Sequence, residues 1–165
     1  EREVIIMLKN VDELLELCDD FVNEIDDFEV NLNTDFFCFP TTNEIFISVL
    51  ASANSIQEFR ENLYSRTDVH DISEFTWSLL HEVGHCQTWH IMNDRTINRC
   101  KHIKRKIERG SIPTTVYYGL TDERIATDWA INFVEENYDE VQAFDVEALT
   151  LLTKIFIDND IDLES

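Results

Sequence analysis

The chain has 165 residues, of which 44% are hydrophobic and 28% are charged, a composition typical of a folded globular domain and not of a disordered chain. Asp and Glu total 34 against 13 Lys and Arg, so the formal net charge is −21, which opposes direct nucleic-acid binding and favours basic protein or peptide partners. The apolar run 4–8 is too short to span a bilayer or to act as a signal-peptide core, and the four cysteines lack C-x-x-C spacing, so we expect a reduced, cytoplasmic protein without membrane contact.

The first half of the chain predicts two helices with a small sheet between them. Only three glycines and two prolines occur in the chain, which favours long helices over a many-stranded sandwich. Apolar residues at helical spacing predict a helix over 11–28, and a shorter helix is expected over 56–65. Between them, 36–39 and 44–49 have the composition of two strands around the turn 40–43.

Four more helices are expected in the second half, over 71–92, 95–109, 121–138 and 145–157. Asp71 is spaced like a capping-box residue before the first of these, which is largely apolar. Gly110 is expected to end the second, and Thr121 to cap the third. We therefore predict a single, mostly helical α+β domain over 1–165, with a small sheet before the apolar helix.

The apolar helix contains His81-Glu82-Val83-Gly84-His85, an H-E-x-x-H motif. Residues four apart lie on one helical face, so both imidazoles can reach one metal ion. Glu82 is rotated off that direction, where it can hold a water whose pKa zinc lowers toward ~7 and accept its proton. The motif could occur by chance, but a buried Glu between two buried histidines would be costly without a metal or a partner. Gly84 inside a helix costs about 1 kcal/mol relative to Ala, which indicates that another element approaches closely there.

Catalytic zinc sites normally have three protein ligands, so one more is needed. His90 stands five residues after His85, and the extended metzincin pattern would require a histidine where the chain has Ile91, which excludes that class. We interpret His102 as a solvated residue of the basic helix. His70, which precedes the apolar helix, stays open as a candidate.

Glu123 is the expected third ligand. It shares a helical face with Ala126 and Ala130, and these small residues would let its helix approach the H-E-x-x-H helix closely. An acidic residue in a first helical turn is also favoured by the helix dipole alone, and Asp122 and Asp128 remain alternatives.

The segments H-E-V-G-H at 81–85 and E-R-I-A-T-D-W-A at 123–130 resemble the gluzincins, a group of zincin metallopeptidases, and especially the small ImmA/IrrE-type peptidases and minimal gluzincins. The resemblance covers 44–134 and implies a zincin-like fold that binds Zn²⁺. In this family a strand before the active-site helix pairs through its edge with an extended substrate, which assigns that role to 44–49. Thr127 stands where gluzincins often carry Asp or Asn as a partner of a ligand histidine, and Gln87 replaces a usually apolar residue.

Two further features flank the expected site. Tyr117 and Tyr118 precede the Glu123 helix, where either could donate a hydrogen bond to an oxyanion or simply pack as a half-buried hydrophobe. Seven of the 13 basic residues lie within 95–109. This basic segment is either a solvated helix face or a lid that selects acidic substrate residues.

The resulting hypothesis is a zinc-dependent metalloendopeptidase that cleaves one or a few intracellular proteins, such as a repressor or another regulatory protein. His81, His85 and Glu123 would bind Zn²⁺, and Glu82 would be the general base. The alternative is an acidic binding module that sequesters a basic or DNA-binding protein, with zinc structural or absent. A third reading is an enzyme inhibited by its own acidic tail, 158–165.

Overall fold

The computed structural model describes residues 8–50 and 53–161, and the side chains of the second range from residue 58 onward. Its helices are α2 (Asp12–Asn23), α3 (Ala53–Tyr64), α4 (Glu74–Thr88), α5 (Asp94–Glu108), α6 (Thr121–Glu136) and α7 (Tyr138–Asp158), with short 3-10 helices η1 (Trp89–Ile91) and η2 (Thr114–Gly119). The mostly helical α+β class is confirmed. Within the described ranges, no helix combines the length and the apolar character needed to cross a bilayer.

Three strands, β1 (Glu29–Leu32), β2 (Phe37–Phe39) and β3 (Glu44–Ile47), form one mixed sheet in the order β1-β3-β2. The predicted hairpin is confirmed, because β2 and β3 pair antiparallel. Strand β1, which pairs parallel to β3, was not predicted and begins directly after the predicted helix 11–28, whereas α2 already ends at Asn23. The helix stops early because the Asn23 side chain bonds both the N–H and the C=O of Phe28 at 3.1 Å, which turns the chain into β1.

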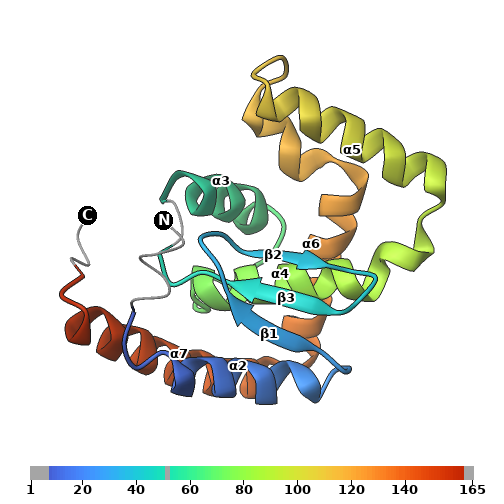
Figure 1. The fold of residues 1–165 in the computed structure, drawn as a ribbon. Coiled ribbons are helices and arrows are strands. Elements are labelled where there is room, and N and C mark those ends of the chain that lie inside the picture. Colours follow the sequence, from blue (N-terminus) through green and yellow to red (C-terminus); the bar gives the residue numbers. More distant parts are fainter. Residues whose placement is uncertain (1–7, 51–52, 162–165) are drawn as a thin grey trace.

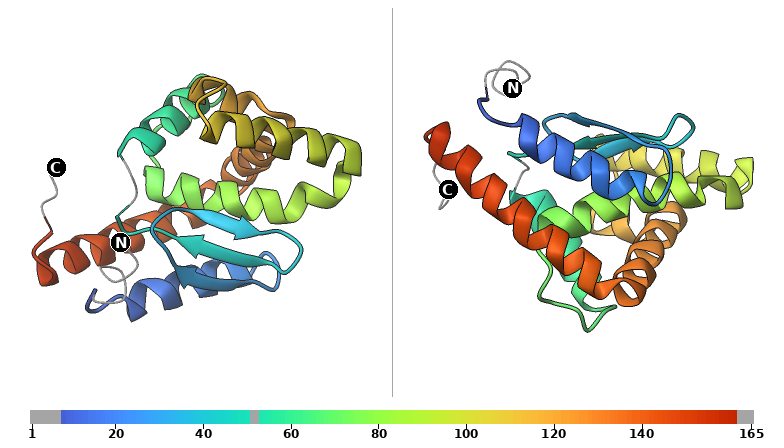
Figure 2. Two further views of the ribbon diagram at one scale, coloured as in Figure 1. Left: turned by 45° about the horizontal axis from the view of Figure 1, so that its top comes forward. Right: turned by 90° about the horizontal axis from the view of Figure 1, so that it is seen from below.

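Helix α4 is the central element of the fold (Figure 1). It runs behind β2 and β3, while α2 and α7 lie side by side next to β1 (Figures 1 and 2). One hydrophobic cluster joins the sheet, α2 and α7 through Leu79, and a second joins α3, α6 and the start of α7 through Leu80. Both leucines are fully buried, and each such side chain contributes about 1.5–3 kcal/mol. The helix is apolar around most of its circumference because it is packed against one hydrophobic cluster through Leu79 and against the other through Leu80.

The predicted starts of α4 and α7 are both wrong, and the contacts of Asp145 explain both errors. The cap of α4 is Ser73, not Asp71, because the Ser73 side chain accepts a hydrogen bond from Thr76 N–H. Helix α7 begins at Tyr138, so Asp145 lies inside it, 4% exposed. The Asp145 carboxylate accepts hydrogen bonds from the Ser73 hydroxyl and amide and from the Thr76 hydroxyl. Asp145 thus fastens α7 to the N-terminus of α4.

Smaller differences occur at other helix ends. Thr121 is the first residue of α6 and does not cap it, since Leu120 holds the cap position without a side-chain hydrogen bond. The predicted helix 71–92 divides into α4 and η1 at Thr88. Gly110, with φ +78°, follows α5 as expected, because this left-handed conformation suits glycine.

Candidate metal centre

The backbones of α4 and α6 touch at Gly84. A Cβ atom built there would overlap the carbonyl oxygen of Ala126 and lie 3.1 Å from its C and Cα atoms. The close approach predicted at this glycine is therefore present. Ala126 and Ala130 are fully buried, as expected for the face of α6 that meets α4. This contact brings Glu123, one turn earlier on α6, to the histidines of α4.

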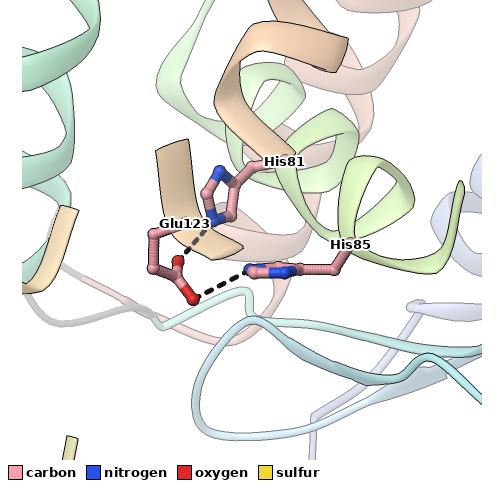
Figure 3. A group of neighbouring side chains, drawn as sticks. All are labelled: His81, His85 and Glu123. Carbon is pink, nitrogen blue, oxygen red and sulfur yellow. Dashed lines mark hydrogen bonds and ion pairs between the residues drawn. The ribbon is translucent and has the colours of Figure 1, made fainter. Parts of the chain in front are cut away.

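His81, His85 and Glu123 converge at the end of this contact (Figure 3). Oε1 of Glu123 lies 2.7 Å from Nε2 of His81, and Oε2 lies 2.9 Å from Nε2 of His85. His81 is 4% exposed and Glu123 is 1% exposed. One ligand atom from each residue lies within 4.8 Å of the others, so the group could hold a metal ion. Two imidazole nitrogens and one carboxylate oxygen are a donor set that suits Zn²⁺ and leaves a coordination position open.

Thr127 orients the first histidine. Its hydroxyl donates to the carbonyl oxygen of Glu123 at 3.0 Å, and the same oxygen lies 3.0 Å from Nδ1 of His81. Because the hydroxyl proton is already used, the hydrogen-bond pattern assigns the proton of the second contact to Nδ1. This leaves Nε2 of His81 as the nitrogen that faces the metal position. Thr127 is therefore the hydrogen-bond partner that fixes the orientation of His81.

The electrostatics of the group match a buried carboxylate that basic side chains keep ionised. Burial opposes ionisation of Glu123, but the charge of His85 and hydrogen bonds from both histidines hold the pKa of its carboxyl well below its usual value. Burial likewise opposes protonation of His85, yet the Glu123 charge and hydrogen bond outweigh it and raise the pKa of His85 to about 9. Glu123 thus keeps its negative charge and can act as a ligand to a cation.

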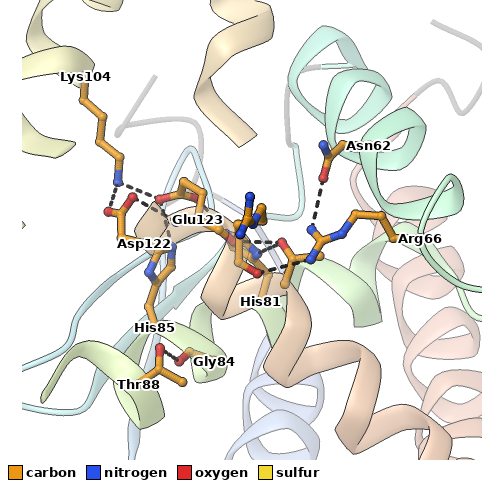
Figure 4. A network of polar contacts seen from close by, with 11 residues as sticks. Asn62, Arg66, His81, Gly84, His85, Thr88, Lys104, Asp122 and Glu123 are labelled. Atoms are coloured by element: carbon orange, nitrogen blue, oxygen red, sulfur yellow. Dashed lines mark hydrogen bonds and ion pairs between the residues drawn. The ribbon is translucent and has the colours of Figure 1, made fainter. Parts of the chain in front are cut away.

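A lysine of the basic segment also reaches the triad (Figure 4). Nζ of Lys104 lies 2.6 Å from Oε2 of Glu123 and 2.6 Å from Oδ2 of Asp122. Burial opposes its charge, but Glu123 and Asp122 outweigh it and raise the pKa of Lys104. Arg105 and Lys106, by contrast, are exposed. The basic segment therefore has both an inward anchor and a solvated outer face.

The other candidate ligands lie elsewhere. Asp122 is paired with Lys104, and Asp128 forms an ion pair with Arg66. His70 stacks on Tyr64, with 4.3 Å between the ring centroids, and its Nε2 lies 2.7 Å from the carbonyl oxygen of Thr67. The exposed residues His90 and His102 are outside the site as well. Among the acidic candidates, Glu123 alone lies beside both motif histidines.

The tail 158–165 is described only to residue 161. Within that part, Asp158 accepts a hydrogen bond from the Asn10 side chain at 2.8 Å. The Asn159 side chain bonds the backbone of Lys9. These contacts fasten the end of α7 to the segment before α2. Residues 162–165 lie outside the described part of the chain.

A pocket of about 300 Å³ opens beside the triad. His81, Glu82 and Glu123 line it, together with Tyr117 and Tyr118 of η2. Burial and the nearby charge of Glu123 raise the pKa of both tyrosines, so both phenols keep their protons and can donate hydrogen bonds. The structure therefore brings together all of the site residues predicted from the sequence.

Strand β3 cannot pair with a substrate through its edge as predicted for 44–49, because β1 and β2 occupy both sides of it. The outer strand on the pocket side is β2, since Asp35 and Phe36, directly before it, line the pocket. Sequence reasoning also missed the inward position of Lys104, which no local pattern signals. The part played by Thr127 was detectable, because it lies four residues after Glu123 on the same helical face.

No protein-family model, curated protein or solved structure matches the chain.

Proposed function

We propose that the chain is a zinc-dependent metalloendopeptidase of the gluzincin type. The observation that carries the proposal is the convergence of His81, His85 and Glu123 beside a pocket that Glu82 also lines. Zinc held by these three residues would lower the pKa of a bound water and polarise the substrate carbonyl. A structural zinc site usually has four protein ligands and no use for a carboxylate such as Glu82, which argues against the sequestering module.

The residues of the chain have distinct tasks in the proposed reaction. Glu82 accepts a proton from the water as its oxygen attacks the carbonyl carbon of the peptide bond, and later transfers that proton to the departing amine as the C–N bond breaks. Tyr117 or Tyr118 donates a hydrogen bond to the oxyanion of the tetrahedral intermediate. The edge of β2 pairs with the extended substrate backbone. Four cysteines without disulfides, together with a net charge of −21 that opposes binding to nucleic acid, favour a cytoplasmic enzyme acting on proteins.

The decisive comparison is Glu82→Gln against Glu123→Ala. Wild type should purify with close to one zinc per chain and hydrolyse a degenerate peptide library, with products identified by mass spectrometry. Glu82→Gln should keep its zinc and lose activity by about 100-fold or more, because the proton acceptor is gone. Glu123→Ala should lose zinc itself.

The exposed residue Glu147 on α7 provides the control, since Glu147→Gln changes the net charge equally and should alter neither property. Absence of zinc from the wild type, with no uptake on addition, would refute the proposed enzyme. Full activity of Glu82→Gln would refute the assigned base.

A further inference from the structure

The pocket beside the triad has an acidic wall that the metal chemistry does not need. Besides Glu82 and Glu123, it is lined by Asp35, from the loop before β2, and Glu58, from α3. No Lys or Arg is among the described residues that line it. Neither Asp35 nor Glu58 forms an ion pair within the described part of the chain. Two negative charges therefore face the pocket without a cation to balance them.

Glu58 is held in place in this wall. It is half-buried, and its Oε1 accepts a hydrogen bond from the hydroxyl of Thr114 in η2 at 2.9 Å. Within the described part of the chain, no hydrogen bond or ion pair occupies the second carboxylate oxygen, which can accept from a ligand. Asp35 is exposed, so it meets the pocket from the solvent side. A half-buried carboxylate that is already oriented loses less freedom when it binds a cation than a fully solvated one.

Part of the remaining wall is apolar. Phe36, Phe59 and Ile107 line the same pocket. Long basic side chains cover apolar surface with their methylene stems while their charged ends stay with polar partners. A pocket lined by both apolar side chains and carboxylates offers partners to both parts of such a side chain.

We propose that this pocket selects a substrate residue with a basic side chain, Lys or Arg, through Glu58 and Asp35. The inference rests on the proposed peptidase function, whose substrate class it specifies. It opposes the lid alternative for the basic segment, in which that segment selects acidic substrate residues. The pocket receives Ile107 from α5, whereas Arg105 and Lys106 are exposed and do not line it.

The test uses zinc-supplemented Glu82→Gln protein, so that binding is measured without cleavage. Two fluorescein-labelled peptide mixtures are compared by anisotropy at low salt. One central position is fixed as Arg in the first and as citrulline, its neutral analogue, in the second. We expect the Arg mixture to bind about tenfold more tightly, because citrulline keeps the shape but removes the charge. Adding Glu58→Gln should reduce the ratio of the two affinities, Arg over citrulline, at least about threefold. Adding Asp35→Asn as well should bring that ratio close to one.

Glu147→Gln in the same background removes a negative charge far along the chain, on α7, and should leave the ratio unchanged. Circular dichroism confirms that each variant is folded. Equal binding of the two mixtures, no measurable binding of the Arg mixture, or an equal effect of Glu147→Gln would overturn the proposal. A preference for Arg in a chain that never hydrolyses a peptide would refute the peptidase and keep the pocket, whereas hydrolysis without this preference would refute the pocket alone.

Discussion

Replacing Gly84 with Ala tests whether backbone contact between α4 and α6 sets the metal site. The new methyl group would gain up to about 1 kcal/mol of helix propensity. It would also overlap the Ala126 carbonyl, and overpacking costs about 1–3 kcal/mol in typical cores. The obstructing atoms belong to the backbone and cannot rotate away, so we expect a cost above that range and a net loss of about 2 kcal/mol. For a chain of this size, that lowers the melting temperature by about 4–8 °C.

The assay combines thermal unfolding of the metal-free chain with zinc affinity measured by competition with a chromophoric chelator. Displacing α6 moves Glu123 relative to both histidines, so zinc affinity should fall at least about tenfold. Gly119→Ala is the matched control, because a Cβ there meets no atom within 4 Å. Wild-type stability and zinc affinity in Gly84→Ala would refute the reasoning.

Two further substitutions test single contacts. Thr127→Val should lower zinc affinity about 10–100-fold, because His81 loses the partner that orients it. The control is Thr150→Val, which removes an equivalent hydroxyl bond to a helix carbonyl, at 2.9 Å on the exposed face of α7, and should leave zinc affinity unchanged. Equal zinc affinities for the two variants would contradict the role of Thr127. Asp145→Ala should destabilise the chain by about 2–4 kcal/mol in urea unfolding, because it leaves the donors at the start of α4 without an acceptor. A loss no larger than that of the exposed variant Glu147→Ala would show that this carboxylate contributes nothing.

The elements that were predicted correctly are those in which local spacing and burial agree. The motif histidines lie on one face of a helix whatever surrounds it, and Glu123 could be proposed because Ala126 and Ala130 mark the face of its helix that meets another backbone. The hairpin of β2 and β3 follows from two β-rich runs around a short turn. In each case the decisive interaction lies within a few residues or depends on side-chain size alone.

The errors arise where distant residues decide the local structure. Asp145 has the sequence features of a helix start, but it lies buried within α7. Its carboxylate accepts hydrogen bonds from Ser73 and Thr76 at the start of α4, which are far away in the sequence. Strand β1 exists because Asn23 turns the chain and β3 offers a free side. The acidic wall of the pocket is contributed by a loop and a helix, at Asp35 and Glu58, that no sequence pattern connects.

Lys104 has a consequence for the chain before it acquires any metal. A buried carboxylate without a counter-charge is expensive, and proteins whose sites are unbalanced in this way often fold only when the ion arrives. Here the ammonium group of Lys104, 2.6 Å from Glu123, and the imidazole of His85 at 2.9 Å offset the charge of Glu123 without a metal ion. For the proposed zinc enzyme, synthesis and folding could then precede metal binding, and the metal-free chain would stay folded until zinc is supplied.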